Sequence, residues 1–184
     1  FIEAGTNSAS SGFIMCAGGN WRFCSNYLSV ASGGAGIVCW GTDSVSALID
    51  RNTVVAAGSG NTHFVLFWGS TGDAGASAWT RGTTYGTTNY VYVEHNNVTF
   101  NALQDGAFDA YAGAKFVIRY NTMTNVYFGW HGCDSGGYRS PHSYEIYGNR
   151  FFYNNGGYYC VFNSRGGTGL MFSNTVAGRT DGGS

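Results

Sequence analysis

Three charged residues stand at the same place in a recurring sequence pattern. Asp50, Glu94 and Arg119 each lie two positions before an asparagine, in successive copies of the pattern. If these positions stack on neighbouring turns of a coil, two carboxylates lie side by side, and like charges directly opposite on a sheet are unfavourable without compensation. A calcium ion bridging Asp50 and Glu94 would compensate them, since Ca²⁺ takes carboxylate oxygens. Alternatively, Arg119 pairs with Glu94 in a surface ladder of ion pairs.

A second group of titratable residues lies close together in the sequence. Histidine changes protonation near neutral pH and serves as an acid or a base. Asp109 and Asp134 are separated by the same interval as Glu94 and Arg119, so they too could stack. Two carboxyl groups about 5–10 Å apart would suit glycoside hydrolysis. The alternative is a loop anchor whose side chains bond backbone carbonyl groups. The candidates are His131, Asp134 and Arg139 for catalysis, and His142 and Glu145 for substrate contact.

Aromatic residues are the third feature, at 17% of the chain. Flat rings with polar tips suit sugar rings at a wet interface. Trp40 and Trp68 occupy similar places in neighbouring turns, which fits either interior stacking or an outer aromatic surface. The candidates for substrate binding are Trp68 and four residues in expected loops, Trp79, Tyr85, Trp130 and Tyr138.

A sequence repeat predicts the strands that must position these residues. An asparagine recurs through the chain at nearly equal intervals, except that the second interval is much longer than the others. Apolar residues stand three before and two after each copy, which is the alternation of a strand and not the period of a helix. The six copies are Asn26, Asn52, Asn96, Asn121, Asn149 and Asn174.

Strands repeating every ~25 residues without a returning helix predict a coil whose turns stack at about 4.8 Å. We expect an all-β solenoid of about six to seven turns, with the asparagines hydrogen-bonded in a ladder at one corner. In one turn of this frame, Phe116, Ile118, Asn121 and Met123 should be buried. The long second interval implies a loop insertion at about 70–88, and residues 178–184 are expected to be a disordered tail or linker after a single domain at 1–177.

Five segments carry the frame most fully: 49–54, 93–98, 116–123, 144–151 and 171–176. They resemble the right-handed parallel β-helix proteins of the pectate-lyase-like superfamily, and the resemblance extends from about residue 21 to residue 176. In lyases of that family, carboxylates on neighbouring turns hold calcium against an acidic sugar while a basic residue abstracts a proton. By resemblance, Arg119 would be the base and calcium the cofactor. The family also includes glycoside hydrolases, tailspikes and adhesins, so the fold does not decide the activity.

The composition excludes several classes of function. Net charge is −1, which provides no basic surface for nucleic acid. No apolar run reaches the ~20 residues of a membrane span. The five cysteines contain no C-x-x-C pair for zinc, and buried free thiols are the simplest interpretation.

The favoured function is an extracellular, cell-surface or virion-surface module. Polysaccharide is the expected partner, or else self-association or a further chain at the ends of the coil, because a solenoid end without a cap exposes apolar surface and strand edges. Such a module would bind polysaccharide or form part of an adhesive or structural fibre. The alternative is a polysaccharide lyase or glycoside hydrolase acting on an acidic glycan.

Overall fold

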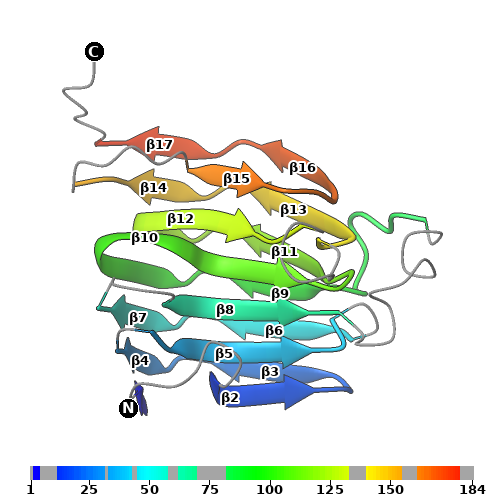
Figure 1. Cartoon of the computed structure of the whole chain (residues 1–184), viewed down its shortest axis with the longest axis horizontal. Coiled ribbons are helices and arrows are strands. Elements are labelled where there is room, and N and C mark those ends of the chain that lie inside the picture. The colour runs from blue at the N-terminus through cyan, green and yellow to red at the C-terminus, as the bar shows by residue number, and fades with distance from the viewer. Residues whose placement is uncertain are drawn as a thin grey trace.

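The chain folds into a parallel β-solenoid. A computed structural model describes residues 2–4, 12–31, 33–42, 45–57, 62–69, 82–132, 140–154 and 161–178, and every regular element among them is a strand. These strands pair in parallel and wind through about five turns (Figure 1). The predicted fold class is therefore confirmed. The prediction of six to seven turns was too high, because six asparagine copies bound only five complete turns.

Two sheets make up the coil. Sheet B holds six strands in one column: β3 (Trp21–Cys24), β6 (Ala47–Asp50), β9 (Val91–Glu94), β11 (Lys115–Arg119), β13 (Ser143–Tyr147) and β16 (Thr168–Phe172). Sheet A has a first column of β1 (Ile2–Ala4), β4 (Tyr27–Val30), β7 (Thr53–Ala56), β14 (Arg150–Phe152) and β17 (Thr175–Ala177). Its second column contains β2 (Gly12–Ala17), β5 (Ala35–Trp40), β8 (His63–Trp68) and β15 (Phe162–Ser164), and two long strands, β10 (Asn97–Tyr111) and β12 (Thr122–Trp130), run through both columns.

Each turn bends between sheet B and sheet A through one left-handed residue. The residue before each ladder asparagine has φ between 53° and 65°, a region that costs an ordinary residue about 1–2 kcal/mol. The asparagine side chain compensates this bend by bonding the backbone around it. The six bend residues are Ser25, Arg51, His95, Tyr120, Gly148 and Ser173.

The predicted asparagine ladder is present through all six copies. In every neighbouring pair, the backbone N–H and the Nδ2 of one asparagine donate to the Oδ1 of the next, at 2.9–3.3 Å. In the interior of the ladder, Nδ2 also donates to backbone carbonyl groups, as Asn121 does to those of Arg119 and Val93. Four of the six asparagines are almost completely buried, so these bonds satisfy groups that water cannot reach.

The interior of the coil is filled by the alternate residues that the repeat predicts. Phe116, Ile118, Asn121 and Met123 are all buried, which confirms that part of the frame. Aromatic rings stack along the coil, and the ring centroids of Phe67 and Phe116 are 4.5 Å apart.

Trp130 belongs to this interior and not to a loop. It is the last residue of β12, its ring is fully buried, and its Nε1 donates to Ser164 Oγ at 3.0 Å. The expected loop position was wrong because β12 runs on from the first column of sheet A into the second, where Phe128 pairs with Phe108 of β10.

The returning part of the insertion lies against sheet B. Within the expected loop 70–88, residues 70–81 fall outside the described part of the chain, and residues from 82 onward run back to β9. Gly86 N–H donates to Glu145 Oε1 at 2.8 Å, and Tyr92 Oη donates to the Thr87 carbonyl. Ser46 Oγ donates to the Thr88 carbonyl. The loop is therefore fastened to three different turns.

The two ends of the coil lie far apart, with β1–β3 at one end and β15–β17 at the other (Figure 1). Of the expected tail at 178–184, only Gly178 is described. The described residues include no helix long and apolar enough to cross a membrane.

Candidate functional site

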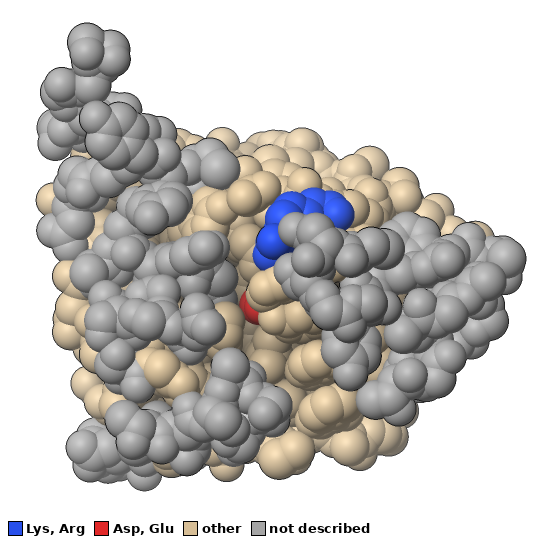
Figure 2. All heavy atoms as spheres, in the orientation of Figure 1, with Lys and Arg blue, Asp and Glu red and all other residues tan. Residues whose placement is uncertain are grey.

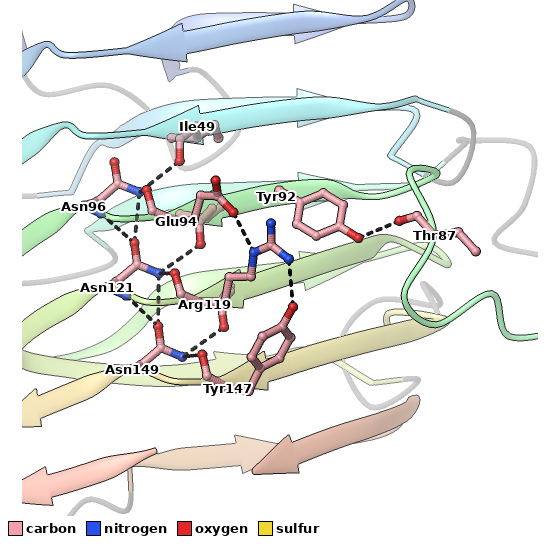
Figure 3. Close-up of polar contacts among 11 residues, drawn as sticks. Ile49, Thr87, Tyr92, Glu94, Asn96, Arg119, Asn121, Tyr147 and Asn149 are labelled. Carbon is pink, nitrogen blue, oxygen red and sulfur yellow. Dashed lines mark hydrogen bonds and ion pairs between the residues drawn. The ribbon is translucent and has the colours of Figure 1, made fainter. Parts of the chain in front are cut away.

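The outward face of sheet B brings the predicted charged residues together. Glu94 is the register partner of Asp50 on one side and of Arg119 on the other. Arg119 Nε donates to Glu94 Oε2 in an ion pair (Figure 3). The predicted pairing of Arg119 with Glu94 is therefore confirmed.

Asp50 has its own arginine, which the sequence interpretation missed. Arg22 Nε and Nη2 donate to the two carboxylate oxygens of Asp50 at 2.8 and 2.6 Å. Asp50 is almost completely buried, and the hydrogen bond from Arg22 holds the pKa of its carboxyl below the ordinary value. Arg22 lies on the outward face of β3, two residues before Cys24, which is the register partner of Asp50. The pair is therefore a diagonal contact between neighbouring strands, which a comparison of equivalent repeat positions does not reveal.

The predicted calcium ligands Asp50 and Glu94 are thus each bound by an arginine. A calcium ion between them would have to displace a guanidinium group from each carboxylate. Within the described ranges, no three His, Cys, Asp or Glu side chains lie together in a way that could hold a metal ion. The residues present do not fit a ready-made calcium site.

Arg119 lies among aromatic rings. Its guanidinium carbon is 4.6 Å from the centroid of the Tyr92 ring, and its Nη1 donates to Tyr147 Oη at 2.8 Å. Burial lowers the pKa of Arg119, but the hydrogen bonds to Tyr147 and Glu94 outweigh burial and keep that pKa above its ordinary value. A guanidinium held in this way stays protonated, so its geometry suits holding a ligand better than abstracting a proton.

A groove of about 490 Å³ opens beside these ion pairs. It crosses four turns of sheet B and has the insertion loop as one wall. In the described part of the chain, Arg22 Nη1 and Arg119 Nη2 form no hydrogen bond, and the buried Trp21 Nε1 has no partner. The lining residues are Asn20, Trp21, Arg22, Ser46, Ala47, Leu48, Thr88, Tyr92, Glu94 and Arg119.

A separate aromatic column stands on the second column of sheet A. The rings of Trp40, Trp68, Tyr111 and His131 stack in that order, with centroids 5.0, 4.5 and 4.4 Å apart. Trp68 is therefore covered on both ring faces, which leaves only its edge for a sugar. Figure 2 shows that the described side chains on this side of the molecule are nearly all uncharged.

His131 ends this column beside a buried carboxylate. Its Nδ1 is 2.9–3.0 Å from the carboxylate oxygens of Asp109, and its Nε2 is 3.4 Å from Tyr111 Oη. The Ala110 N–H also donates to Asp109 Oδ1 at 2.8 Å. Burial, followed by the Asp109 charge, raises the pKa of Tyr111 well above its ordinary value. The pair resembles an acid–base dyad in geometry, with the carboxylate orienting the imidazole.

The remaining predicted site residues have different surroundings. Glu145 is buried under the insertion loop, and the buried His142 has its Nδ1 3.2 Å from Ser143 Oγ. Tyr85 lies in the described part of the insertion, where burial raises the pKa of its hydroxyl. Four predicted residues lie outside the described part of the chain: Trp79, Asp134, Tyr138 and Arg139.

Comparisons of the chain with protein-family models, with curated proteins and with solved structures found no match.

Proposed function

We propose that this chain is a polysaccharide-binding module built on a right-handed β-helix of the pectate-lyase-like kind. The observation that carries the proposal is the sheet-B groove, whose volume of about 490 Å³ suits a short stretch of glycan. Polysaccharides occur on the surfaces of cells and virions, so the proposal includes an extracellular, cell-surface or virion-surface location.

The groove offers the two kinds of contact that a sugar requires. Leu48 and Ala47 form an apolar floor for the C–H face of a ring. The unused guanidinium N–H groups are donors for hydroxyl or carboxylate oxygens. The guanidinium groups are fixed by their own carboxylates, so little side-chain entropy is lost when a glycan binds.

Each arginine that lines the groove has a carboxylate partner. Arg22 and Arg119 are balanced by Asp50 and Glu94. The site therefore recognises sugar oxygens by hydrogen bonding more than by net attraction, and it is open to neutral glycans as well as uronic acids.

Leu48→Glu tests the groove, and Leu170→Glu is a matched control. Both leucines lie four residues before a ladder asparagine and face outward from sheet B, but only Leu48 lines the groove. A carboxylate at position 48 removes the apolar floor and competes for Arg22. Calorimetric titration with neutral and uronic-acid oligosaccharides should show affinity falling by about tenfold or more for Leu48→Glu and unchanged for Leu170→Glu. The proposal fails if no oligosaccharide binds, or if both variants bind as the parent chain does.

A lyase or hydrolase is the second candidate, and the Asp109–His131 pair favours it. An imidazole oriented by a buried carboxylate can move a proton at Nε2. Release of unsaturated or reducing ends from acidic polysaccharides would be measured for the parent chain, His131→Gln and Asp109→Asn. Turnover that disappears in both variants supports the enzyme, whereas turnover that persists in His131→Gln contradicts a catalytic role for this pair.

A further inference from the structure

We propose that Cys16 and Cys39 are a redox-sensitive pair, which a small-molecule disulfide such as oxidised glutathione converts into a disulfide that locks two turns of the coil together. This inference concerns strands β2 and β5 and does not depend on the proposed glycan groove.

The strand register places the two cysteines opposite each other. Cys16 of β2 is the register partner of Cys39 of β5. Neighbouring parallel strands lie about 4.8 Å apart, and the Cα atoms of a disulfide usually lie about 4.4–6.8 Å apart. The backbone separation therefore already suits a disulfide.

Both side chains point to the same side of the sheet, towards the interior of the coil. Cys39 is fully buried within the main hydrophobic core. Cys16 is only partly exposed, whereas its neighbours Met15 and Ala17 are exposed, which is the alternation of a strand with Cys16 on the inner face. After burial, the charge of a Cys16 thiolate is the second cause of the raised pKa of Cys39, as expected for two adjacent thiols.

Closing the bond requires only a small movement of the backbone. The Cβ atoms of paired residues on parallel strands are about one strand spacing apart, whereas a disulfide holds them about 3.5–4.5 Å apart. β2 therefore has to move towards β5 by roughly half an ångström. Among the described strands, β2 pairs with β5 alone, so no second ladder resists this movement.

The two thiols differ in access, which gives each of them a separate role. Cys16 is partly exposed, so its thiolate can attack the external disulfide, break the S–S bond and release one glutathione. Cys39 is out of reach of the external reagent but lies beside the Cys16 sulfur, from which its thiolate displaces the second glutathione. In each step the proton lost by the cysteine is taken up by the departing glutathione thiolate. Two protein thiols are thereby oxidised, and one glutathione disulfide is reduced to two thiols.

The bond would enclose one complete turn of the coil. Strands β3 and β4 lie between the two cysteines in the sequence, so the covalent ring would contain both of them. Closing this loop removes conformations from the unfolded chain. The oxidised chain should therefore be harder to unfold than the reduced chain.

The third described cysteine provides an internal control. The register partner of Cys24 on β6 is Asp50 and not a thiol, so Cys24 should stay reduced under the same treatment. Cys133 and Cys160 lie outside the described part of the chain.

Mapping of disulfide-linked peptides tests the inference. The folded full chain is incubated with oxidised glutathione, the remaining thiols are blocked with iodoacetamide in urea, and the peptides are identified by mass spectrometry. Cleavage by trypsin at Arg22 and by chymotrypsin at Tyr27 puts each of the three described cysteines on its own peptide. We expect a Cys16–Cys39 link, and a urea midpoint about 1 M higher for the oxidised chain than for the reduced chain.

Single substitutions separate the two roles. Cys39→Ala should retain glutathione on Cys16, because the thiol that displaces it is missing, whereas Cys16→Ala should leave Cys39 unmodified in the folded chain. Both variants should lose the gain in urea midpoint, and Cys24→Ala should behave as the parent chain does. Circular dichroism establishes that the variants are folded.

The inference is overturned if Cys16 and Cys39 remain free thiols after oxidation of the parent chain, or if Cys16 links to a different cysteine. It is also overturned if the link forms without raising the urea midpoint. These three outcomes are read from the parent chain, so they decide the matter even where Cys39→Ala fails to fold.

Discussion

Asn121 Oδ1 accepts two hydrogen bonds from Asn96, one from the backbone N–H at 2.9 Å and one from Nδ2 at 3.0 Å. Both residues are buried, so this oxygen satisfies the Asn96 N–H and Nδ2 at a place that water cannot reach. The corner of the coil therefore depends on one amide per turn.

Replacing a ladder asparagine should be costly. Asn121→Ala leaves the Asn96 N–H and the carbonyl groups of Arg119 and Val93 without their partner. An unsatisfied buried polar group costs about 1–3 kcal/mol, so the free energy of unfolding should fall by about 3–5 kcal/mol. Urea denaturation measures this. Asn97→Ala, at an exposed asparagine beside the ladder, is the control and should change stability by less than about 0.5 kcal/mol; equal effects would contradict the role of the ladder.

Among the six bend residues, only Gly148 has no side chain. The ring of Tyr120 occupies the space that a side chain at position 148 would need. A Cβ at position 148 would lie 2.6 Å from the Tyr120 ring. We expect Gly148→Ala to cost about 2–3 kcal/mol, from the left-handed backbone and the contact together. Gly86→Ala has a similar φ but open space around its Cβ, so it should cost only about 1 kcal/mol.

A double-mutant cycle separates the two terms. With Tyr120→Ala in the background, Gly148→Ala should lose the contact term and cost about as much as Gly86→Ala. If the cost in that background is unchanged, the ring is not the reason for the glycine.

The Arg22–Asp50 pair should make stability dependent on pH in the acid range. The Arg22 hydrogen bond lowers the pKa of Asp50 in the folded chain, relative to about 3.9 for an unfolded aspartate. The stabilisation is therefore fully present above pH ~4 and is lost as pH falls through the folded pKa. Arg22→Met should lower the urea midpoint at pH 7, and its difference from the parent chain should shrink towards pH 3.

Arg150→Met provides the comparison for this pH series. Arg150 is exposed and lies on β14, away from Asp50. Its substitution should shift the urea midpoint little, and by the same amount at every pH. If the difference in urea midpoint between Arg22→Met and the parent chain does not decrease towards pH 3, the lowered pKa of Asp50 is contradicted.

The thiols should react in an order set by burial. Cys39 is fully buried and burial raises the pKa of its thiol well above the ordinary value, while Cys16 and Cys24 are partly exposed. Iodoacetamide reacts with the thiolate, so Cys39 should be alkylated only after unfolding. Peptide mass spectrometry before and after adding urea tests this, with Cys24 as the internal reference; rapid labelling of Cys39 in the folded chain would contradict it.

The repeat predicted the fold because its signal is local and periodic. Phe116 and Ile118 alternate with outward residues in each copy, and a side chain on a parallel strand has the same direction in the next turn. The same frame correctly placed Arg119 opposite Glu94. The repeat did not predict the role of Arg22, because Arg22 and Asp50 occupy different positions of the repeat and their hydrogen bond runs diagonally between strands.

The frame failed where the strands are irregular. The regular repeat interval leads from Asp109 to Asp134, but β10 shifts its register against β12 between Thr99 and Phe108. Phe108 therefore pairs with Phe128, which comes well before a full interval has passed, and Asp109 lies against His131. Sequence spacing does not reveal such a shift, because a bulge adds residues without adding a turn.

The interval between Asn52 and Asn96 is much longer than the one between Asn96 and Asn121, yet the backbone N–H···Oδ1 distance is 2.9 Å in both rungs. The geometry of the corner is therefore set by the spacing between stacked turns. It does not depend on how many residues separate two ladder asparagines in the sequence. Foreign peptides or whole domains grafted between Gly69 and Gly82 should accordingly be displayed on the side of an undisturbed rod, which makes this coil a scaffold for protein engineering.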